Sequence, residues 1–179
     1  MSTQPSSLQC IVSLDPSSMV VGYAVMLTDG TLVQAGPITP EDKQADSFER
    51  VQSLGDDVWS LLDRHQPEII LIEWTAGKVG QRRHHGGGAG LSVYGCGVGW
   101  IGCICHTWIT AGTWCALQMP RLIPVLENDW TGGVEKEDRQ IAVAQYYPQY
   151  DPSQDADGDV ADAIGMALWW LKEERIKDY

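Results

Sequence analysis

The sequence predicts an α/β protein with a mixed five-stranded sheet flanked by helices. Two short apolar runs, Cys10–Asp15 and Glu68–Glu73, are bounded by turn residues, a pattern typical of buried strands. The second run is apolar almost throughout, which indicates burial on both faces, as in parallel strands. The pair Asp29-Gly30 lies between two β-prone segments and predicts a hairpin. Antiparallel strands early in the chain and parallel strands later therefore predict one mixed sheet.

Length and charge limit the possible classes of protein. The chain has 179 residues, 44% of them hydrophobic and 20% charged, which suits a single domain that spans the whole chain. Its formal net charge of -12 argues against a nucleic-acid partner, because phosphate binding needs local positive potential. No Asp or Glu lies between Glu73 and Glu127, however, and this stretch contains Lys78, Arg82 and Arg83. We therefore expect a positive face on an acidic protein.

The first half of the chain reads as a meander followed by a helix. The strand after Asp15 is expected at Met19–Leu27, and a third strand at Thr31–Ala35. Thr39-Pro40, followed by two acidic residues, is typical of a helix start. Apolar residues then recur at helical spacing and predict a face buried against the sheet. These residues are Phe48, Val51, Leu54, Val58, Leu61 and Leu62.

A basic, glycine-rich segment follows the fourth strand. Residues 77–90 contain Lys78, Arg82 and Arg83 and are expected to form a mobile loop beside Glu73. A mobile basic loop next to acidic residues suits a phosphodiester substrate. The alternative is a solvated loop without a ligand.

The segment Leu91–Met119 has no Asp, Glu, Lys or Arg, so a membrane span has to be considered. Its many small and polar residues make it a poor span, and a long helix buried against the sheet fits better. Gly95, Gly99 and Gly102 follow at helical spacing and would allow close packing. His106, on the same face, is expected to be a core histidine.

The remaining segments before the last helix are a strand, a loop and a helix. Arg121–Leu126 is a fifth strand, and Pro124 within it indicates an edge position. The loop Glu127–Gly133 then leads into a helix at about Glu135–Tyr147, which a proline follows. We assign no chemistry to these segments from their pattern alone.

Two kinds of metal site are poorly supported. Zinc on Cys103, Cys105 and His106 lacks the usual ligand spacing and a second cysteine pair, so buried thiols are the simpler interpretation. Five cysteines without a preceding signal peptide are expected to be reduced, in the cytoplasm. The run from Ser153 resembles the start of a calcium loop, but Ile164 stands where that loop needs a bidentate glutamate.

Four acidic residues mark the ends of predicted elements. Asp15 and Glu73 end two apolar strands, and adjacent parallel strands would place them side by side. Asp159 and Asp162 lie one turn apart at the start of the last helix and share one face. An ionised acid at the end of a buried strand needs a positive partner, and no Lys or Arg is near Asp15 in sequence. We therefore predict a metal site, although strand-end acids in polar loops and helix capping are the simpler alternatives.

The order of these motifs resembles the RNase H-like superfamily and, within it, the RuvC-type Holliday junction resolvases. The resemblance rests on Leu14-Asp15-Pro16-Ser17 with Gly22-Tyr23, on Ile72-Glu73, on Val134-Glu135-Lys136 and on Asp159-Val-Ala-Asp162-Ala163. It covers nearly the whole chain. It implies that Asp15, Glu73, Asp159 and Asp162 form an acidic tetrad and that Lys136 lies close to the scissile phosphate. It also implies a homodimer with the long helix near its interface.

The activity implied is Mg-dependent hydrolysis of four-way DNA junctions. Two Mg²⁺ or Mn²⁺ ions about 4 Å apart suit hard carboxylate ligands. Asp15 would bridge both ions, Glu73 and Asp162 would each bind one, and Asp159 would bind one or orient its water. The expected DNA contacts are Lys78, Arg82, Arg83, Lys136 and Arg139.

The chain departs from the family where Ser17 replaces a usual glycine and Trp74 a usual glutamine. Three alternatives stay open. One is a non-catalytic DNA-binding or assembly protein on the same fold. A second is an RNase H-like nuclease acting on flaps or RNA-DNA hybrids. An actin-like kinase would need a longer chain.

Overall fold

The fold of the protein is taken from a computed structural model, which describes residues 8–74, 89–112, 114 and 119–177. These residues form five strands and five α-helices, with one short 3₁₀-helix at Pro152–Gln154. The strands are β1 (Cys10–Pro16), β2 (Val21–Leu27), β3 (Leu32–Ile38), β4 (Ile69–Trp74) and β5 (Arg121–Leu126). The helices are α1 (Ser47–His65), α2 (Ala89–Ala111), α3 (Glu127–Thr131), α4 (Lys136–Tyr146) and α5 (Asp159–Lys177).

The strands form one mixed sheet in the order β3-β2-β1-β4-β5. β1, β2 and β3 pair antiparallel, and β4 lies parallel to both β1 and β5. The hairpin predicted at Asp29-Gly30 is present, with Gly30 at a φ of 95°. The mixed five-stranded sheet flanked by helices is confirmed, and β5 with Pro124 is an edge strand of it.

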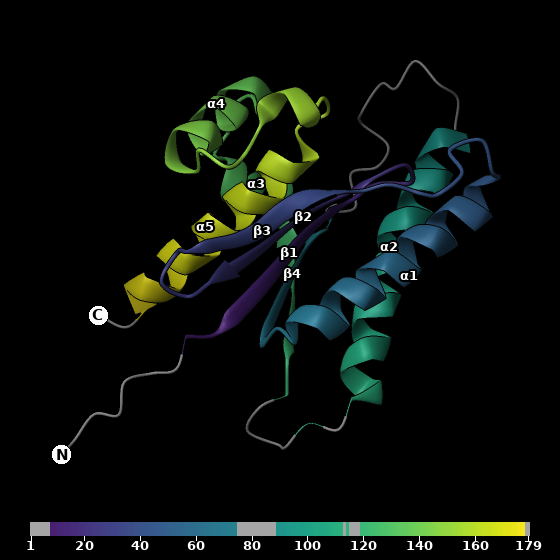
Figure 1. The fold of residues 1–179 in the computed structure, drawn as a ribbon, viewed down its shortest axis with the longest axis horizontal. Coiled ribbons are helices and arrows are strands. Elements are labelled where there is room, and N and C mark those ends of the chain that lie inside the picture. Colours follow the sequence, from purple (N-terminus) through teal and green to yellow (C-terminus); the bar gives the residue numbers. More distant parts are fainter. Residues whose placement is uncertain (1–7, 75–88, 113, 115–118, 178–179) are drawn as a thin grey trace.

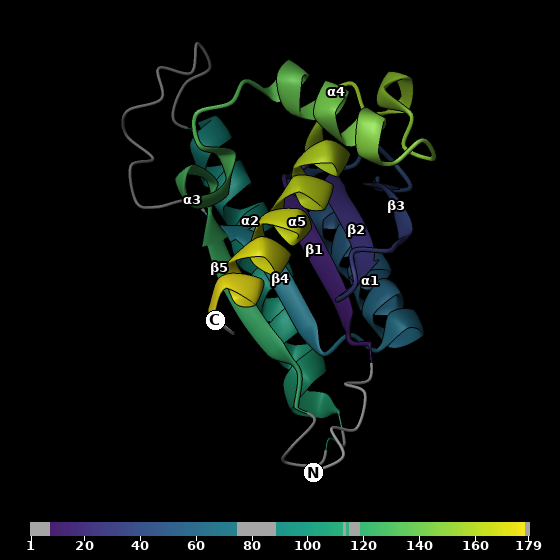
Figure 2. The same cartoon turned by 90° about the vertical axis from the view of Figure 1, so that its left-hand side faces the viewer.

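Helices cover both faces of the sheet in three layers. α5 lies diagonally across one face, with α3 and α4 on the same side near one end of the strands (Figure 1, Figure 2). α1 and α2 pack together on the opposite face (Figure 1). The strands alternate their side chains between these layers, as pleated strands must.

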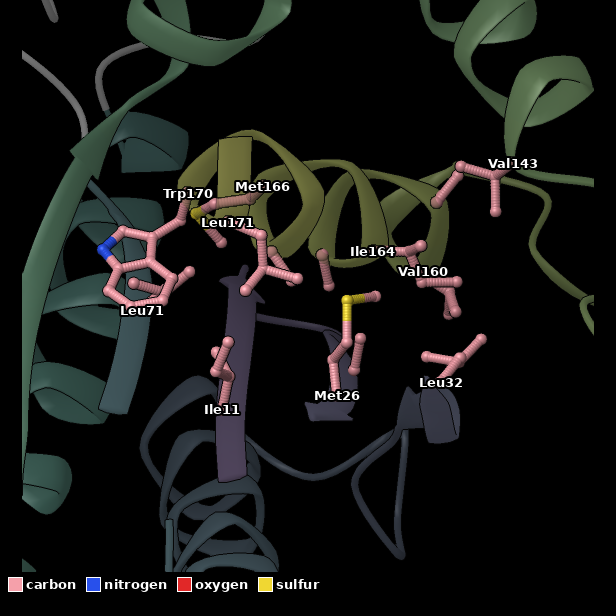
Figure 3. Packing of buried hydrophobic residues seen from close by; sticks show 14 of the residues in the cluster. Ile11, Met26, Leu32, Leu71, Val143, Val160, Ile164, Met166, Trp170 and Leu171 are labelled. Carbon is pink, nitrogen blue, oxygen red and sulfur yellow. The ribbon is translucent and has the colours of Figure 1, made fainter. Parts of the chain in front are cut away.

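The α5 layer packs on every second residue of the central strands. Ile11 of β1 and Leu71 of β4 belong to the same buried cluster as Ile164, Met166 and Trp170 of α5 (Figure 3). Within the same layer, the buried Ser13 Oγ donates a hydrogen bond of 2.6 Å to the Ala163 carbonyl. This bond and the apolar contacts fix α5 over β1.

The opposite layer is apolar throughout its centre. Val12, Leu14, Ile70 and Ile72 face α1 and α2 and are fully or almost fully buried. The predicted face of α1 is buried at Val51, Leu54, Val58, Leu61 and Leu62. Phe48 was predicted to join it but is 69% exposed, because it lies in the first turn beyond the edge of the packed region.

Several predicted boundaries are wrong for local reasons. α1 begins at Ser47 and not at Thr39, because Asp46 caps it by accepting hydrogen bonds from two backbone amides. α2 ends at Ala111, earlier than predicted. The predicted loop at Glu127–Gly133 contains the short helix α3.

The packing of α2 also differs from the sequence prediction. An added Cβ would have no neighbour within 4 Å at Gly95 or Gly99, whereas at Gly97 it would lie 3.0 Å from the Ser17 carbonyl oxygen. Gly97 therefore provides a close approach to the loop after β1. His106 is exposed and not in the core. Among the residues that the structure describes, no helix has the length and apolar character needed to span a membrane.

Candidate active site

The two strand-borne acids lie side by side at one end of the sheet. Leu14 of β1 pairs with Ile72 of β4 in parallel register, so the next residues, Asp15 and Glu73, end adjacent strands. Each belongs to the alternating set that faces α5. Asp15 is 8% exposed and Glu73 is 9% exposed. The sheet thus places two nearly buried carboxyl groups together, as the sequence predicts.

The start of α5 brings the second pair of acids to the same end. Asp159 and Asp162 lie in the first turn of α5. Asp162 is 4% exposed, and the Asp159 side chain is 14% exposed. All four acids predicted from the sequence therefore gather at one end of the molecule, although they come from three separate elements.

A glycine sets how closely α5 approaches the sheet. Gly22 of β2 pairs with Asp15 in the antiparallel ladder. A Cβ at Gly22 would lie 2.1 Å from the carbonyl oxygen of Asp159 and 2.8 Å from the amide nitrogen of Val160. Only glycine at position 22 allows this approach, which brings the start of α5 against β2, next to Asp15.

The sequence analysis missed the residue that caps α5. The buried Asp155 accepts hydrogen bonds from the amides of Val160 (3.1 Å) and Ala161 (2.9 Å). The Tyr150 hydroxyl donates a further bond of 2.7 Å to the same carboxylate. These bonds fix the first turn of α5 and with it Asp159 and Asp162. An aspartate four residues before a helical Asp-x-x-Asp was the available signal, but Asp155 is only one of five aspartates between positions 151 and 162, which concealed it.

Two cations of α4 reach the carboxylates of α5. Lys136 Nζ lies 2.8 Å from Asp159 Oδ1 and 3.3 Å from Asp162 Oδ2. Arg139 binds Asp162 through both arms of its fork, Nε to Oδ1 at 2.8 Å and Nη2 to Oδ2 at 3.0 Å. Lys136 therefore lies next to the acids, and its implied closeness to the scissile phosphate stays a prediction. Arg139 is engaged with a carboxylate, and its predicted contact with DNA stays a prediction.

Burial and mutual repulsion disfavour the ionised forms of the strand-borne acids. Burial, followed by the charges of Glu73, Asp159 and Asp162, raises the pKa of Asp15 well above its usual value. Burial and the charge of Glu127 raise the pKa of Glu73 to about 7. Burial also raises the pKa of Asp159, although the bonded Lys136 opposes this. No side chain within the described residues donates a hydrogen bond to Asp15.

A second residue missed from the sequence is Trp130 of α3. Its indole Nε1 donates a hydrogen bond of 3.2 Å to Glu73 Oε2. The guanidinium carbon of Arg139 lies 5.0 Å from the centre of its ring. The sequence offered no signal for it, since this segment was predicted to be a loop.

The four acids offer the type of ligand that a hard divalent cation prefers. Four carboxylates supply oxygen ligands, and Asp15 is a nearly buried acid without a compensating donor among the described side chains. In the observed arrangement, no three His, Cys, Asp or Glu residues of the described ranges are placed to hold a metal ion. Lys136 and Arg139 pair with two of the four acids there. Binding of an ion would therefore require Lys136 to leave. Asp162 could keep its bonds to Arg139, because a carboxylate bound to one arginine still has free lone pairs for a metal.

Two further groups of residues were considered in the sequence analysis: the basic residues of the predicted loop and the cysteines weighed as zinc ligands. Lys78, Arg82 and Arg83, with nearly all of the predicted loop at 77–90, lie outside the described residues. Cys103 is exposed, while Cys105 is buried and has a pKa raised by burial to about 12. Cys103 and Cys105 therefore lie in different surroundings.

Comparison with known proteins rests on the fold. No family model and no curated protein matches the sequence. Among solved structures, RuvC of T. thermophilus in complex with a Holliday junction substrate superposes with a TM-score of 0.66 at 17% identity, covering 94% of this chain and 96% of that chain. The chain has the RuvC-like fold. The mixed sheet and its helices are thus RNase H-like, and the resemblance noted in the sequence is confirmed for the fold.

A second RuvC-like structure extends this likeness to another organism. The yeast mitochondrial Holliday junction resolvase Ydc2 superposes with a TM-score of 0.62 at 14% identity, covering 94% of this chain and 80% of that chain. Uncomplexed RuvC of Thermus thermophilus gives a TM-score of 0.65 at 17% identity, with the same coverage as the junction complex. Identities this low establish the shared fold alone.

Proposed function

We propose that this chain is a structure-selective endonuclease that hydrolyses phosphodiester bonds in four-way DNA junctions with the help of Mg²⁺ or Mn²⁺. One observation carries the proposal: Asp15, Glu73, Asp159 and Asp162 come from β1, β4 and α5 to one end of the sheet. The RuvC-like fold supports it, because one solved structure with this fold is RuvC in complex with a Holliday junction substrate and another is described as a Holliday junction resolvase.

The residues divide into ligands and a phosphate contact. Asp15 and Glu73 would hold the ions from the sheet, and Asp159 and Asp162 from the helix. Bound divalent ions would supply an activated water and neutralise charge on the phosphate and the leaving oxygen. The raised pKa values of Asp15 and Glu73 support this assignment, since buried acids that repel one another are stabilised by a cation between them.

Lys136 links the metal-free and the DNA-bound forms. Its side chain is 38% exposed, so it can leave Asp159 and Asp162 by rotation of its own flexible stem. If divalent ions neutralised these acids, the ammonium group of Lys136 would be free to contact the phosphate. The ion pairs of Lys136 therefore represent a resting arrangement in which the lysine occupies space that an ion would take.

The decisive experiment is cleavage of a synthetic four-way junction by the full chain, with Mg²⁺ and with a chelator in its place. Nicks that require Mg²⁺ are the expected result. A linear duplex, a flap and an RNA-DNA hybrid serve as substrate controls. If the chain cleaves the hybrid or the flap with Mg²⁺ but not the junction, its substrate is a different nucleic acid from the one proposed. If it cleaves none of these substrates, the nuclease proposal is rejected.

A second candidate is a non-catalytic DNA-binding or assembly protein with the same fold. The bidentate pair of Arg139 with Asp162, reinforced by Lys136, favours it, because two of the four acids are already neutralised by protein cations. The net charge of -12 also fits weak DNA affinity. Junction binding without metal-dependent nicking would select this candidate.

We also propose that the chain forms a homodimer through the α1 and α2 layer. A hollow of about 560 Å³ lies between the two helices, and its walls include Phe48, Gly99 and Trp100. Phe48 is 69% exposed and Trp100 is 39% exposed, which is unfavourable for large apolar side chains in water. A second copy is the partner that the RuvC resemblance implies for the long helix.

A further inference from the structure

Trp130 touches both halves of the candidate active site. Its indole N–H donates to Glu73, at the end of β4, and its ring lies under the guanidinium of Arg139, which binds Asp162 of α5. Glu73 and Asp162 themselves come from different elements. One side chain of α3 therefore connects the acid on the sheet to the acid on the helix.

The Asp162 side of this connection is held tightly. The Arg139 side chain is 14% exposed, and both arms of its fork bind the Asp162 carboxylate. A further guanidinium nitrogen donates to the Val134 carbonyl. A guanidinium stacked on an aromatic ring and bonded along its edges has little freedom to rotate. The position of the Trp130 ring thus determines where Arg139 holds Asp162.

The ring is itself fixed by a glycine of α5. A Cβ at Gly165 would lie 2.8 Å from Cζ3 of Trp130. Gly165 follows Asp162 by three residues, so it is one helical turn further along the same face. The indole therefore rests against α5 directly below the acid, and its other edge points to Glu73.

Glu73 and Asp162 are both nearly buried and carry like charges when ionised, so contacts that hold each carboxylate in place oppose their mutual repulsion. The N–H of Trp130 donates to Glu73, and the guanidinium of Arg139 binds Asp162 through two of its nitrogen atoms. Without these contacts, either acid could turn away from the other in the absence of a cation. The contacts keep both oriented before any ion arrives.

We infer that Trp130 is a positioning residue that holds Glu73 directly, and Asp162 through Arg139, at the end of the sheet where the divalent ions would bind. The inference rests on the proposed function of these acids. It predicts that loss of the indole N–H weakens metal binding by about tenfold, the usual range for an outer-shell partner.

Trp170 offers a matched control for ordinary packing. It belongs to the same core layer, is 6% exposed and also lies under an arginine, with the guanidinium carbon of Arg121 at 5.8 Å from its ring. It makes no contact with the four acids in any described interaction. If Trp130 only filled space, Trp130→Phe and Trp170→Phe would have similar consequences.

The test measures Mg²⁺ binding to the metal-free full chain by isothermal titration calorimetry, together with single-turnover junction cleavage at increasing Mg²⁺. For Trp130→Phe we expect an approximately tenfold higher dissociation constant and a matching rise in the Mg²⁺ concentration for half-maximal cleavage. At saturating Mg²⁺ its rate should approach that of the wild type. Trp170→Phe should leave both Mg²⁺ constants unchanged.

A measurement on the unaltered ring covers the case in which Trp130→Phe does not fold. In protein labelled with ¹⁵N at the indoles, Mg²⁺ should shift the Trp130 N–H resonance and leave that of Trp170 in place. Glu73→Gln should shift the Trp130 resonance without metal. A Trp130 resonance that responds to neither change overturns the inference.

The remaining outcomes separate the inference from the proposed function. If the wild type binds Mg²⁺ and cleaves while Trp130→Phe has the same Mg²⁺ constants, the inference is rejected and the nuclease stands. Equal losses in Trp130→Phe and Trp170→Phe also reject the inference, since packing then explains both. If the wild type neither binds Mg²⁺ nor cleaves, the inference and the proposed function fail together.

Discussion

The two faces of the sheet are built from the same strands but have opposite characters at their ends. Leu14 and Ile72 point into the apolar layer under α1 and α2, whereas the next residues, Asp15 and Glu73, point toward α5. Because side chains alternate along a strand, one residue separates core from site. The α5 face thus gathers acids over a close helix contact, and the other face stays apolar and leaves a hollow between its helices. This difference is the reason for proposing the active site on the α5 face and self-association on the α1 and α2 face.

The largest expected effect tests the acidic face. Asp15→Asn should lower Mg²⁺-dependent junction cleavage by more than about a hundredfold, since it removes a direct ligand and not merely an outer-shell partner. Rates from single-turnover cleavage, with circular dichroism to check the fold, provide the measurement. The control is Asp56→Asn, which removes a charge from an exposed position of α1 on the opposite face. Full activity in Asp15→Asn would reject the site.

The acids could be predicted from the sequence because their positions follow from local patterns. An apolar run that ends in Asp15 or Glu73 specifies both a buried strand and a carboxyl group at its end. Parallel pairing then brings the two together. The first turn of α5 contributes Asp159 and Asp162 by simple helical spacing. Lys136 was singled out only through the resemblance, because nothing in its local sequence pattern indicates its position in the fold.

The rest of the site depends on contacts between distant segments. Trp130 lies in a segment without periodicity, and its bond to Glu73 exists only because β5 is next to β4. Asp155 was one of several aspartates, and its role as a cap depends on the path of the chain before α5. The exposure of Phe48 also depends on where α1 begins, which Asp46 decides. The hydrophobic periodicity of the sequence carries no information on these contacts or on where α1 begins.

Glycines on the two faces provide the next contrast. Gly22→Ala should lower the free energy of unfolding by about 3 kcal/mol, because its Cβ would meet the Asp159 backbone at 2.1 Å and force α5 away. Gly95→Ala in α2 meets nothing within 4 Å and should instead raise it by about 0.5–1 kcal/mol through reduced backbone entropy. Chemical denaturation measures both. Equal effects of the two substitutions would show that α5 does not approach β2 as closely as described.

A smaller effect concerns pH. The pKa of Glu73 is raised to about 7 by burial and by Glu127, whereas in the unfolded chain it is near 4.5. As pH rises between these values the unfolded state loses this proton first, so the metal-free protein should lose stability, on the order of 2 kcal/mol. Glu73→Gln should remove this part of the pH dependence. Denaturation curves from pH 4.5 to 7.5 in a chelator test it, and an unchanged slope in the variant would contradict the assignment to Glu73.

The smallest expected effect tests the apolar face. Gly99→Arg places a charge in the hollow beside Trp100, where the described chain leaves room for the side chain but a second copy would not. Dimer affinity, measured by sedimentation over a range of concentrations, should fall by at least about tenfold, since a charge is costly to bury in an apolar interface. Mg²⁺ binding by each chain should persist, because the four acids lie on the other side of the sheet. A dimer of unchanged affinity would show that copies associate elsewhere, and a monomeric wild type would remove assembly from this face altogether.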